Sequence, residues 1–314
     1  MRKAVLVAAM AVLVLFTGST GPMRSAAAAP PAGRELFSPP TGFWIMRSDG
    51  SNALYGPTSA SADWTVAQWN IPTELPTFQN GVTQNQFARV SIEADGSVTL
   101  SQYGDALSCR KQYASGMSDV HEFDLFLRPN NGTPPGYPKA TTGPSARLGE
   151  LSHIFHAIEV EPRSVEAKDA SCQVTKAVFL TAIVLANPSK RQTIFYQLRL
   201  GAFTATGSSL SSINLPPFWF GKGTDPRTAR TGYFGYDDSI SSFEQEPVAI
   251  NKPSKYALDL LPRFTALIRE GAQFELDQDL SHWIISGAYH GEIVWGHIRV
   301  SSHWQNFSLA AQQK

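Results

Sequence analysis

Alternating apolar and polar positions dominate this chain, and helical spacing is scarce. Residues 87–102 alternate on both sides of the turn Asp95-Gly96, which predicts a β-hairpin. Residues 122–127 alternate in the same way and stop at a run of Pro, Asn and Gly. Short extended segments separated by turn residues predict an all-β sandwich or barrel.

A longer apolar segment covers residues 177–186 and ends at Asn187-Pro188. Its length and its β-branched residues favour a strand buried on both faces, although a buried helix is the alternative. Residues 192–200 then predict the strand that pairs with it in a hairpin.

One helix is predicted near the end of the chain. Asp259 can cap it, Pro262 falls in its first turn and Gly271 can close it. Its apolar face consists of Leu260, Leu261, Phe264, Leu267 and Ile268. Two last strands are expected over residues 283–289 and 292–307, with a turn beginning at His290-Gly291.

Two segments show no regular pattern. Residues 133–149 are rich in Pro, Gly and Thr and predict a long surface loop. Residues 207–247 are polar, aromatic and irregular, a composition that argues against disorder and favours a functional loop. Since no repeat or linker separates these parts, we expect one jelly-roll β-sandwich domain over residues 30–314 with one short helix.

The first 29 residues resemble a secretion signal. Arg2 and Lys3 precede an apolar run over residues 4–16, and small residues follow up to Ala29. A membrane anchor is the alternative, but the run is short for a span and no second stretch approaches twenty residues. We therefore expect a secreted, extracytoplasmic protein with no membrane span in the mature chain.

Charge and cysteine content narrow the function further. Removal of residues 1–29 leaves a formal net charge of −3 and no basic stripe, so nucleic acid is not an expected partner. Cys109 and Cys172 are the only cysteines, and in an exported chain they are expected to form a disulfide, two buried thiols being the alternative. We expect no cofactor and no metal.

Candidate chemistry lies in two acidic segments. The strand period of two puts Glu122, Asp124 and Phe126 on one face, which should look toward solvent or a ligand. Glu292 lies among aromatic and glycine residues, between Tyr289 and Trp295. Aromatic rings stack on sugar rings, and a carboxylate can move a proton at a glycosidic oxygen, so the expected partner is a polysaccharide or oligosaccharide.

These two segments resemble glycoside hydrolase family 12, a family of concanavalin-like jelly rolls. The similarity covers residues 121–130 and 259–309, where a helix, a Trp-bearing strand, a Gly-Glu segment and a final strand follow in the family's order. The resemblance implies a retaining endo-glycosidase in which Glu122 is the nucleophile and Glu292 the general acid/base. Asp124 departs from the family's apolar residue and is instead similar to strands of family 16.

Four further residues are candidates for substrate binding: Asp124, Trp219, Tyr289 and Trp295. Two other functions stay open. One is a non-catalytic glycan-binding or surface protein of the same fold. The other is a polysaccharide lyase, for which His153, His156, Tyr289 and Arg199 are candidate residues. No nucleophile elbow, P-loop or dinucleotide fingerprint is present in the sequence.

Overall fold

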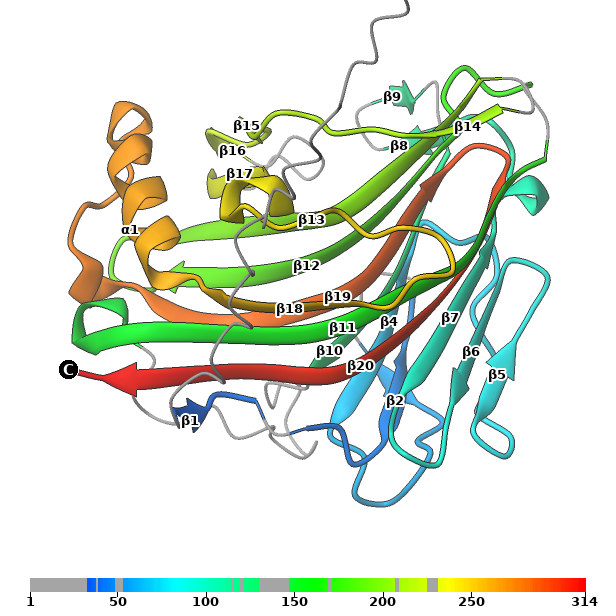
Figure 1. Cartoon of the computed structure of the whole chain (residues 1–314), viewed down its shortest axis with the longest axis horizontal. Helices are drawn as coiled ribbons and strands as arrows, with labels where there is room; N and C mark the ends of the chain where they lie inside the picture. The colour runs from blue at the N-terminus through cyan, green and yellow to red at the C-terminus, as the bar shows by residue number, and fades with distance from the viewer. Residues whose placement is uncertain are drawn as a thin grey trace, which may run out of the picture.

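The computed structural model describes residues 33–314, apart from residue 38 and the segments 49–52, 114–115, 119–120, 130–146, 169–170, 207–208 and 225–230. Two large β-sheets pack face to face, and their long strands bend along the length of the molecule (Figure 1). The predicted jelly-roll β-sandwich is confirmed by this arrangement. The signal segment and most of the 133–149 loop lie outside the described residues.

Among the described residues, the smaller sheet has seven strands. In spatial order they are β18 (Ser254–Asp259), β11 (Leu151–Ala167), β20 (Ile298–Gln313), β7 (Val98–Tyr103), β6 (Ala88–Ile92) and β5 (Val82–Gln84), with β1 (Arg34–Glu35) beside β20. All of its strand pairs are antiparallel.

The larger sheet has eleven strands within the same described residues. Its main path is β15 (Phe218–Trp219), β17 (Thr231–Ser239), β13 (Gln192–Thr206), β12 (Lys176–Asn187), β19 (Ile284–Trp295), β10 (Glu122–Pro129), β4 (Trp64–Trp69), β2 (Phe43–Met46) and β3 (Leu54–Tyr55). Strands β14 (Ser209–Ser212) and β16 (Gly223–Thr224) pair with β13 and β17. A separate hairpin joins β8 (Lys111–Tyr113) to β9 (Gly116–Ser118).

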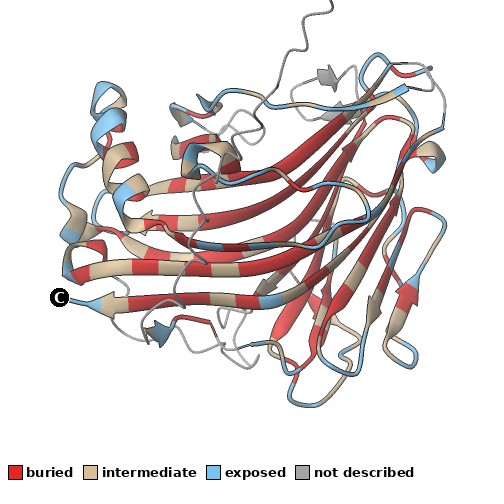
Figure 2. Cartoon of the chain, viewed as in Figure 1, coloured by how far each residue is buried: buried red, intermediate tan, exposed pale blue. Residues whose placement is uncertain are grey.

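The core lies between the two sheets, and buried residues run along the whole length of the central strands (Figure 2). Side chains alternate across β10 and β12, so each of these strands also buries apolar residues on the opposite face. That opposite face, here called the outer face of the large sheet, carries a second apolar cluster that includes Ala67, Phe126, Leu180 and Ile293.

Several predicted elements are confirmed. The 87–102 hairpin corresponds to β6 and β7, and the apolar segment at 177–186 forms β12, which pairs with β13 as expected. The predicted helix is α1 (Leu261–Glu270), which lies at one end of the sandwich (Figure 1). The Asp259 side chain accepts a hydrogen bond from the backbone N–H of Leu261, and Gly271 follows the last helical turn.

Residues 207–247 are not the irregular loop that the sequence predicts. Strands β14 to β17 lie within this segment, and β17 pairs in parallel with β13 over seven residues. The pattern looks irregular because three of these strands are only two to four residues long, and β17 carries aromatic and acidic residues on opposite faces. Tyr236 points into the core, whereas Asp237 points to the outer face and pairs with Arg199.

The turn predicted at His290-Gly291 is also wrong. Strand β19 continues through both residues to Trp295, and the chain turns at Gly296, which has a φ of +67°. Gly291 is required for another reason, because a Cβ there would lie 2.2 Å from the carbonyl oxygen of Leu125 on the neighbouring strand. The sequence alone does not distinguish a glycine that allows two backbones to approach from a glycine that forms a turn, and this is why the turn was predicted at the wrong residue.

Cys109 and Cys172 form the expected disulfide, with a Cα–Cα distance of 5.1 Å. It joins the segment after the short helix η1 (Gly104–Ala106) to the connection between β11 and β12. The remaining short helices are η2 (Leu148–Glu150), η3 (Ile240–Phe243), η4 (Gly271–Phe274) and η5 (Leu280–His282). None of the helices in the described residues is both long and apolar enough to cross a membrane.

Replacing both cysteines, Cys109→Ala with Cys172→Ala, should lower the free energy of unfolding. The disulfide closes a loop with a sequence separation of 63, for which the chain-entropy account gives about 4 kcal/mol. Urea unfolding of the oxidised wild type, the reduced wild type and the double variant measures the effect. Identical midpoints for all three would contradict it.

Candidate functional site

The outer face of the large sheet gathers the acidic residues of β10. Glu122, Asp124 and Phe126 share this face, as the alternation predicts. In β19 their direct partners are Trp295, Ile293 and Gly291 in the same order. Because residues paired across two strands lie on the same face, these three β19 residues also belong to the outer face.

Each of the two β10 carboxylates is held by a side-chain donor. The indole N–H of Trp295 donates to Oε2 of Glu122 at 2.9 Å. The side-chain amide of Asn70, just after β4, donates to Oδ2 of Asp124 at 2.9 Å. Both carboxylates are largely buried, so these bonds fix the direction of groups that would otherwise be costly to bury.

Aromatic side chains lie beside the carboxylates on the same face. The ring of Trp69 lies 5.8 Å from that of Phe126 and 5.7 Å from that of Tyr289, while Phe195 lies 5.7 Å from Tyr289. The guanidinium of Arg128 sits 5.7 Å from the Tyr289 ring centre. Trp69 and Tyr289 are only half-buried, so part of each ring faces solvent.

Further charged groups extend the face toward β17. The ammonium of Lys176 lies 5.0 Å from the Trp295 ring centre, and Arg199 forms an ion pair with Asp237. Burial lowers the pKa of Lys176, an effect that the nearby Asp237 and Glu122 carboxylates oppose. Burial also raises the pKa of Asp237 to about 6, although Arg199 acts in the opposite direction.

Glu292 does not join this face. Its cross-strand partners are Leu125 in β10 and Phe179 in β12, and both point into the core between the sheets. Glu292 is 0% exposed. The predicted pairing of Glu122 with Glu292 is therefore wrong, because the two side chains leave the same sheet on opposite faces.

In the core, Glu292 belongs to a small polar network. The hydroxyl of Ser302 donates to Oε2 of Glu292, and the indole N–H of Trp304 donates to the Ser302 oxygen at 2.6 Å. Burial raises the pKa of Glu292 to about 8, and the Ser302 bond only partly offsets it. At neutral pH this side chain is a buried, uncharged carboxylic acid.

Two histidines share the interior near this network. His290 stacks on His156 at 5.5 Å between ring centres, and its Nδ1 lies 2.9 Å from the hydroxyl of Thr181. Burial lowers the pKa of His156 to about 4 and holds the pKa of His290 well below its ordinary value. Both rings are therefore neutral, and neither faces the outer surface of the large sheet.

The remaining candidates divide in the same way. Tyr289 and Trp295 lie on the outer face with Asp124, whereas Trp219 packs on the core side against Tyr236 at 4.9 Å and Phe274 at 5.4 Å. Trp219 therefore lies on the opposite side of the sheet from the other substrate-binding candidates. The lyase candidates fall into two groups. His156 lies in the core and His153 pairs with Asp259 on the small sheet, whereas Tyr289 and Arg199 lie on the outer face of the large sheet, where Arg199 is bound to Asp237.

Asn70 and Lys176 are among the contributors that the sequence analysis did not identify. Asn70 has a φ of +65°, which an Asn directly after a strand tolerates, but the sequence carries no sign that its amide reaches Asp124. The predicted strand began at residue 177, one residue too late. A start at Lys176 would have placed this lysine on the outer face by the alternation of β12. Within the described residues, the side chains that lie close enough together to hold a metal ion are Cys109, Cys172 and His297, and the two cysteines form the disulfide.

Solved structures of similar fold include several carbohydrate-active enzymes. A family 12 xyloglucanase from Bacillus licheniformis has 12% sequence identity and a TM-score of 0.43, over 79% of this chain and 100% of its own. An endoglucanase from Rhodothermus marinus has 11% identity and a TM-score of 0.39, over 74% and 92%. A family 11 xylanase from Neocallimastix patriciarum has 6% identity and a TM-score of 0.36, over 81% and 97%.

The family that residues 121–130 and 259–309 resemble is thus represented among these structures. At this identity the likeness concerns the fold alone, and the jelly-roll assignment rests on the two sheets themselves. No family model matches the chain, and no curated protein matches it.

The substitution Glu292→Gln should flatten the pH dependence of stability above pH 5. The folded pKa of about 8 exceeds the ordinary value of 4.5, so the wild type loses stability as pH rises from about 4.5 through 8. Since a tenfold difference in proton affinity is about 1.4 kcal/mol, the loss amounts to several kcal/mol. Urea unfolding at intervals from pH 5 to pH 9 measures it.

The exposed Glu150 supplies the control, because Glu150→Gln should leave the wild-type profile unchanged. Subtracting the free energy of unfolding of Glu292→Gln from that of the wild type at each pH gives the contribution of the glutamate alone. The two buried histidines are present in both proteins, and their lowered pKa values reduce stability only below about pH 6.5. Parallel profiles for the wild type and Glu292→Gln would show that Glu292 is not neutral in the fold.

Proposed function

We propose that this chain is an extracytoplasmic glycan-binding protein that uses the outer face of its large sheet. The observation that carries the proposal is the grouping of half-exposed aromatic rings with two oriented carboxylates on that face. Aromatic rings bind the apolar face of a sugar ring, and carboxylates accept hydrogen bonds from its hydroxyl groups.

Binding without cleavage fits the register of β10 and β19. A glycosidase needs two carboxyl groups about 5–5.5 Å apart for retention or about 6.5–9.5 Å apart for inversion. The β19 residues beside Glu122 and Asp124 are Trp295 and Ile293, and Gly291 follows. None of these three carries a carboxyl group, and the glutamate of this strand lies in the core.

Hydrolysis is the second candidate, and one observation favours it. The bond from the Trp295 indole orients the Glu122 carboxylate, as a nucleophile requires. Its proton donor would then come from a group other than Glu292, and Asp124 is the carboxyl group closest along the strand. This candidate and the binding protein share one surface and differ in whether a product forms.

Binding to a panel of neutral and acidic polysaccharides tests the proposal, with dissociation constants measured by calorimetry for any ligand found. Trp69→Ala should weaken binding by about tenfold or more, equivalent to about 1.4 kcal/mol, because it removes a stacking ring. Trp219→Ala is the matched control, since it removes an indole on the core side and should leave affinity unchanged.

Assay of the same mixtures for reducing ends separates the two candidates. A binding protein gives none, and Glu122→Gln then changes affinity alone. Reducing ends that disappear with Glu122→Gln would assign hydrolysis instead. The proposal that the outer face binds glycans would be contradicted if Trp69→Ala and Trp219→Ala lost affinity equally. It would also be contradicted if the protein bound no polysaccharide.

A further inference from the structure

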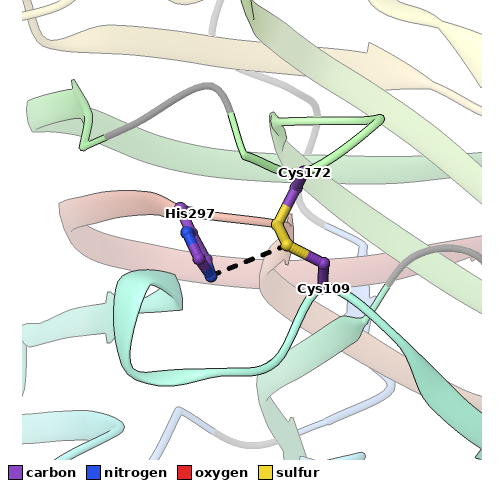
Figure 3. Close-up of side chains that lie close together, drawn as sticks. All are labelled: Cys109, Cys172 and His297. Carbon is purple, nitrogen blue, oxygen red and sulfur yellow. Dashed lines mark hydrogen bonds between the residues drawn. A yellow bond between two sulfur atoms is a disulfide. The ribbon is translucent and has the colours of Figure 1, made fainter.

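Three segments that are distant in sequence meet at the disulfide (Figure 3). Cys109 follows η1, Cys172 lies in the connection between β11 and β12, and His297 lies in the turn between β19 and β20. The sulfur and imidazole ligand atoms of these three residues all lie within 4.8 Å of one another. The glycan proposal makes no use of this group.

Close backbone packing holds these segments together independently of the disulfide bond. A Cβ on Gly296 would lie 2.3 Å from the carbonyl oxygen of Val174 and 2.9 Å from Cβ of Cys172. A Cβ on Gly104 would lie 2.4 Å from the carbonyl oxygen of Gly296. Two glycines therefore permit an approach that any larger residue would prevent.

Backbone hydrogen bonds add to this packing. The N–H of Lys168 donates to the carbonyl of His297 at 2.9 Å, and the N–H of Gly296 donates to that of His121 at 3.2 Å. The N–H of His121 in turn donates to the carbonyl of Cys109 at 2.8 Å. These bonds do not involve sulfur, so we expect the three side chains to stay close when the disulfide is opened.

The distances suit a tetrahedral metal ion. Zinc binds thiolate sulfur at about 2.3 Å and imidazole nitrogen at about 2.0–2.1 Å, so ligand atoms in a tetrahedral site lie roughly 3.5–3.8 Å apart. Nε2 of His297 is 3.8 Å from Sγ of Cys109. The two sulfur atoms are now covalently joined and would have to separate.

The surroundings of His297 can orient it as a ligand. Its Nε2 donates to the carbonyl of Leu107 at 2.9 Å, and its Nδ1 lies 2.9 Å from the hydroxyl of Ser171. When Nε2 binds a metal, the proton moves to Nδ1, and the Ser171 oxygen becomes the acceptor. A metal-bound histidine commonly has such a second partner on its other nitrogen.

We propose that, after reduction of the disulfide, Cys109, Cys172 and His297 form a binding site for a thiophilic divalent cation such as Zn²⁺. A phosphine or dithiol reductant supplies two electrons and is itself oxidised, and each sulfur takes up one proton. The two thiols release these protons when they bind the ion as thiolates. The fourth coordination position is open to water.

The test uses the whole mature chain, reduced with a phosphine and titrated with Zn²⁺ against a chromophoric chelator. Reduced wild type should bind one Zn²⁺ per chain and oxidised wild type none. His297→Ala should weaken binding at least tenfold, and Cys172→Ser should abolish it. His303→Ala removes a histidine of β20 that lies outside the site and is the matched control.

Co²⁺ supplies a second measurement, because thiolate ligands give it a charge-transfer absorption that His297→Ala should alter. Circular dichroism follows the fold of each sample. Recovery of the fold by Zn²⁺ in a reduced chain that has lost it would support the site. A reduced chain that binds no Zn²⁺, that binds equally well without His297, or that stays unfolded with Zn²⁺ overturns the proposal.

Discussion

The register between β10 and β19 is the constraint on which the rest of this structure depends. Glu122 pairs with Trp295, and the assignment of the paired side chains of β10 and β19 to the core or to the outer face of the large sheet follows from that pair. The same register brings an indole donor to Glu122 and places Glu292 opposite Leu125. The pairing of β10 with β19 therefore places a candidate ligand site on one face of the sheet and a polar core network on the other.

The polar core network and the two histidines beside it show how a sandwich of this size tolerates ionisable groups between its sheets. Glu292, His156 and His290 are all buried, and the shifts of their pKa values keep each one uncharged near neutral pH. Neutral partners such as Ser302 and Thr181 supply the hydrogen bonds. A neutral acid and neutral imidazoles cost far less to bury than their ions.

The sequence predicted the fold class, α1 and the outward face of β10, because alternation and cap residues are local signals. It predicted the disulfide because the chain has only two cysteines. It did not predict the side on which Glu292 lies. That side depends on where β19 ends, and Gly291 and Gly296 look equivalent in sequence although one allows a close backbone approach and the other makes the turn. Contacts such as Asn70 with Asp124 join distant segments and leave no local pattern.

The turn at Gly296 fixes which residues of β19 point outward over the stretch from Gly287 to Trp295, beyond which the pairing shifts register. From Gly287 onward, positions an odd number of residues before Gly296 point outward, as Trp295 and Tyr289 do, and even positions point inward, as Glu292 does. A single insertion or deletion between glutamate and turn would exchange the two sets. In relatives of this chain, counting back from the turn glycine would therefore distinguish a carboxylate available for catalysis from one buried as part of the architecture.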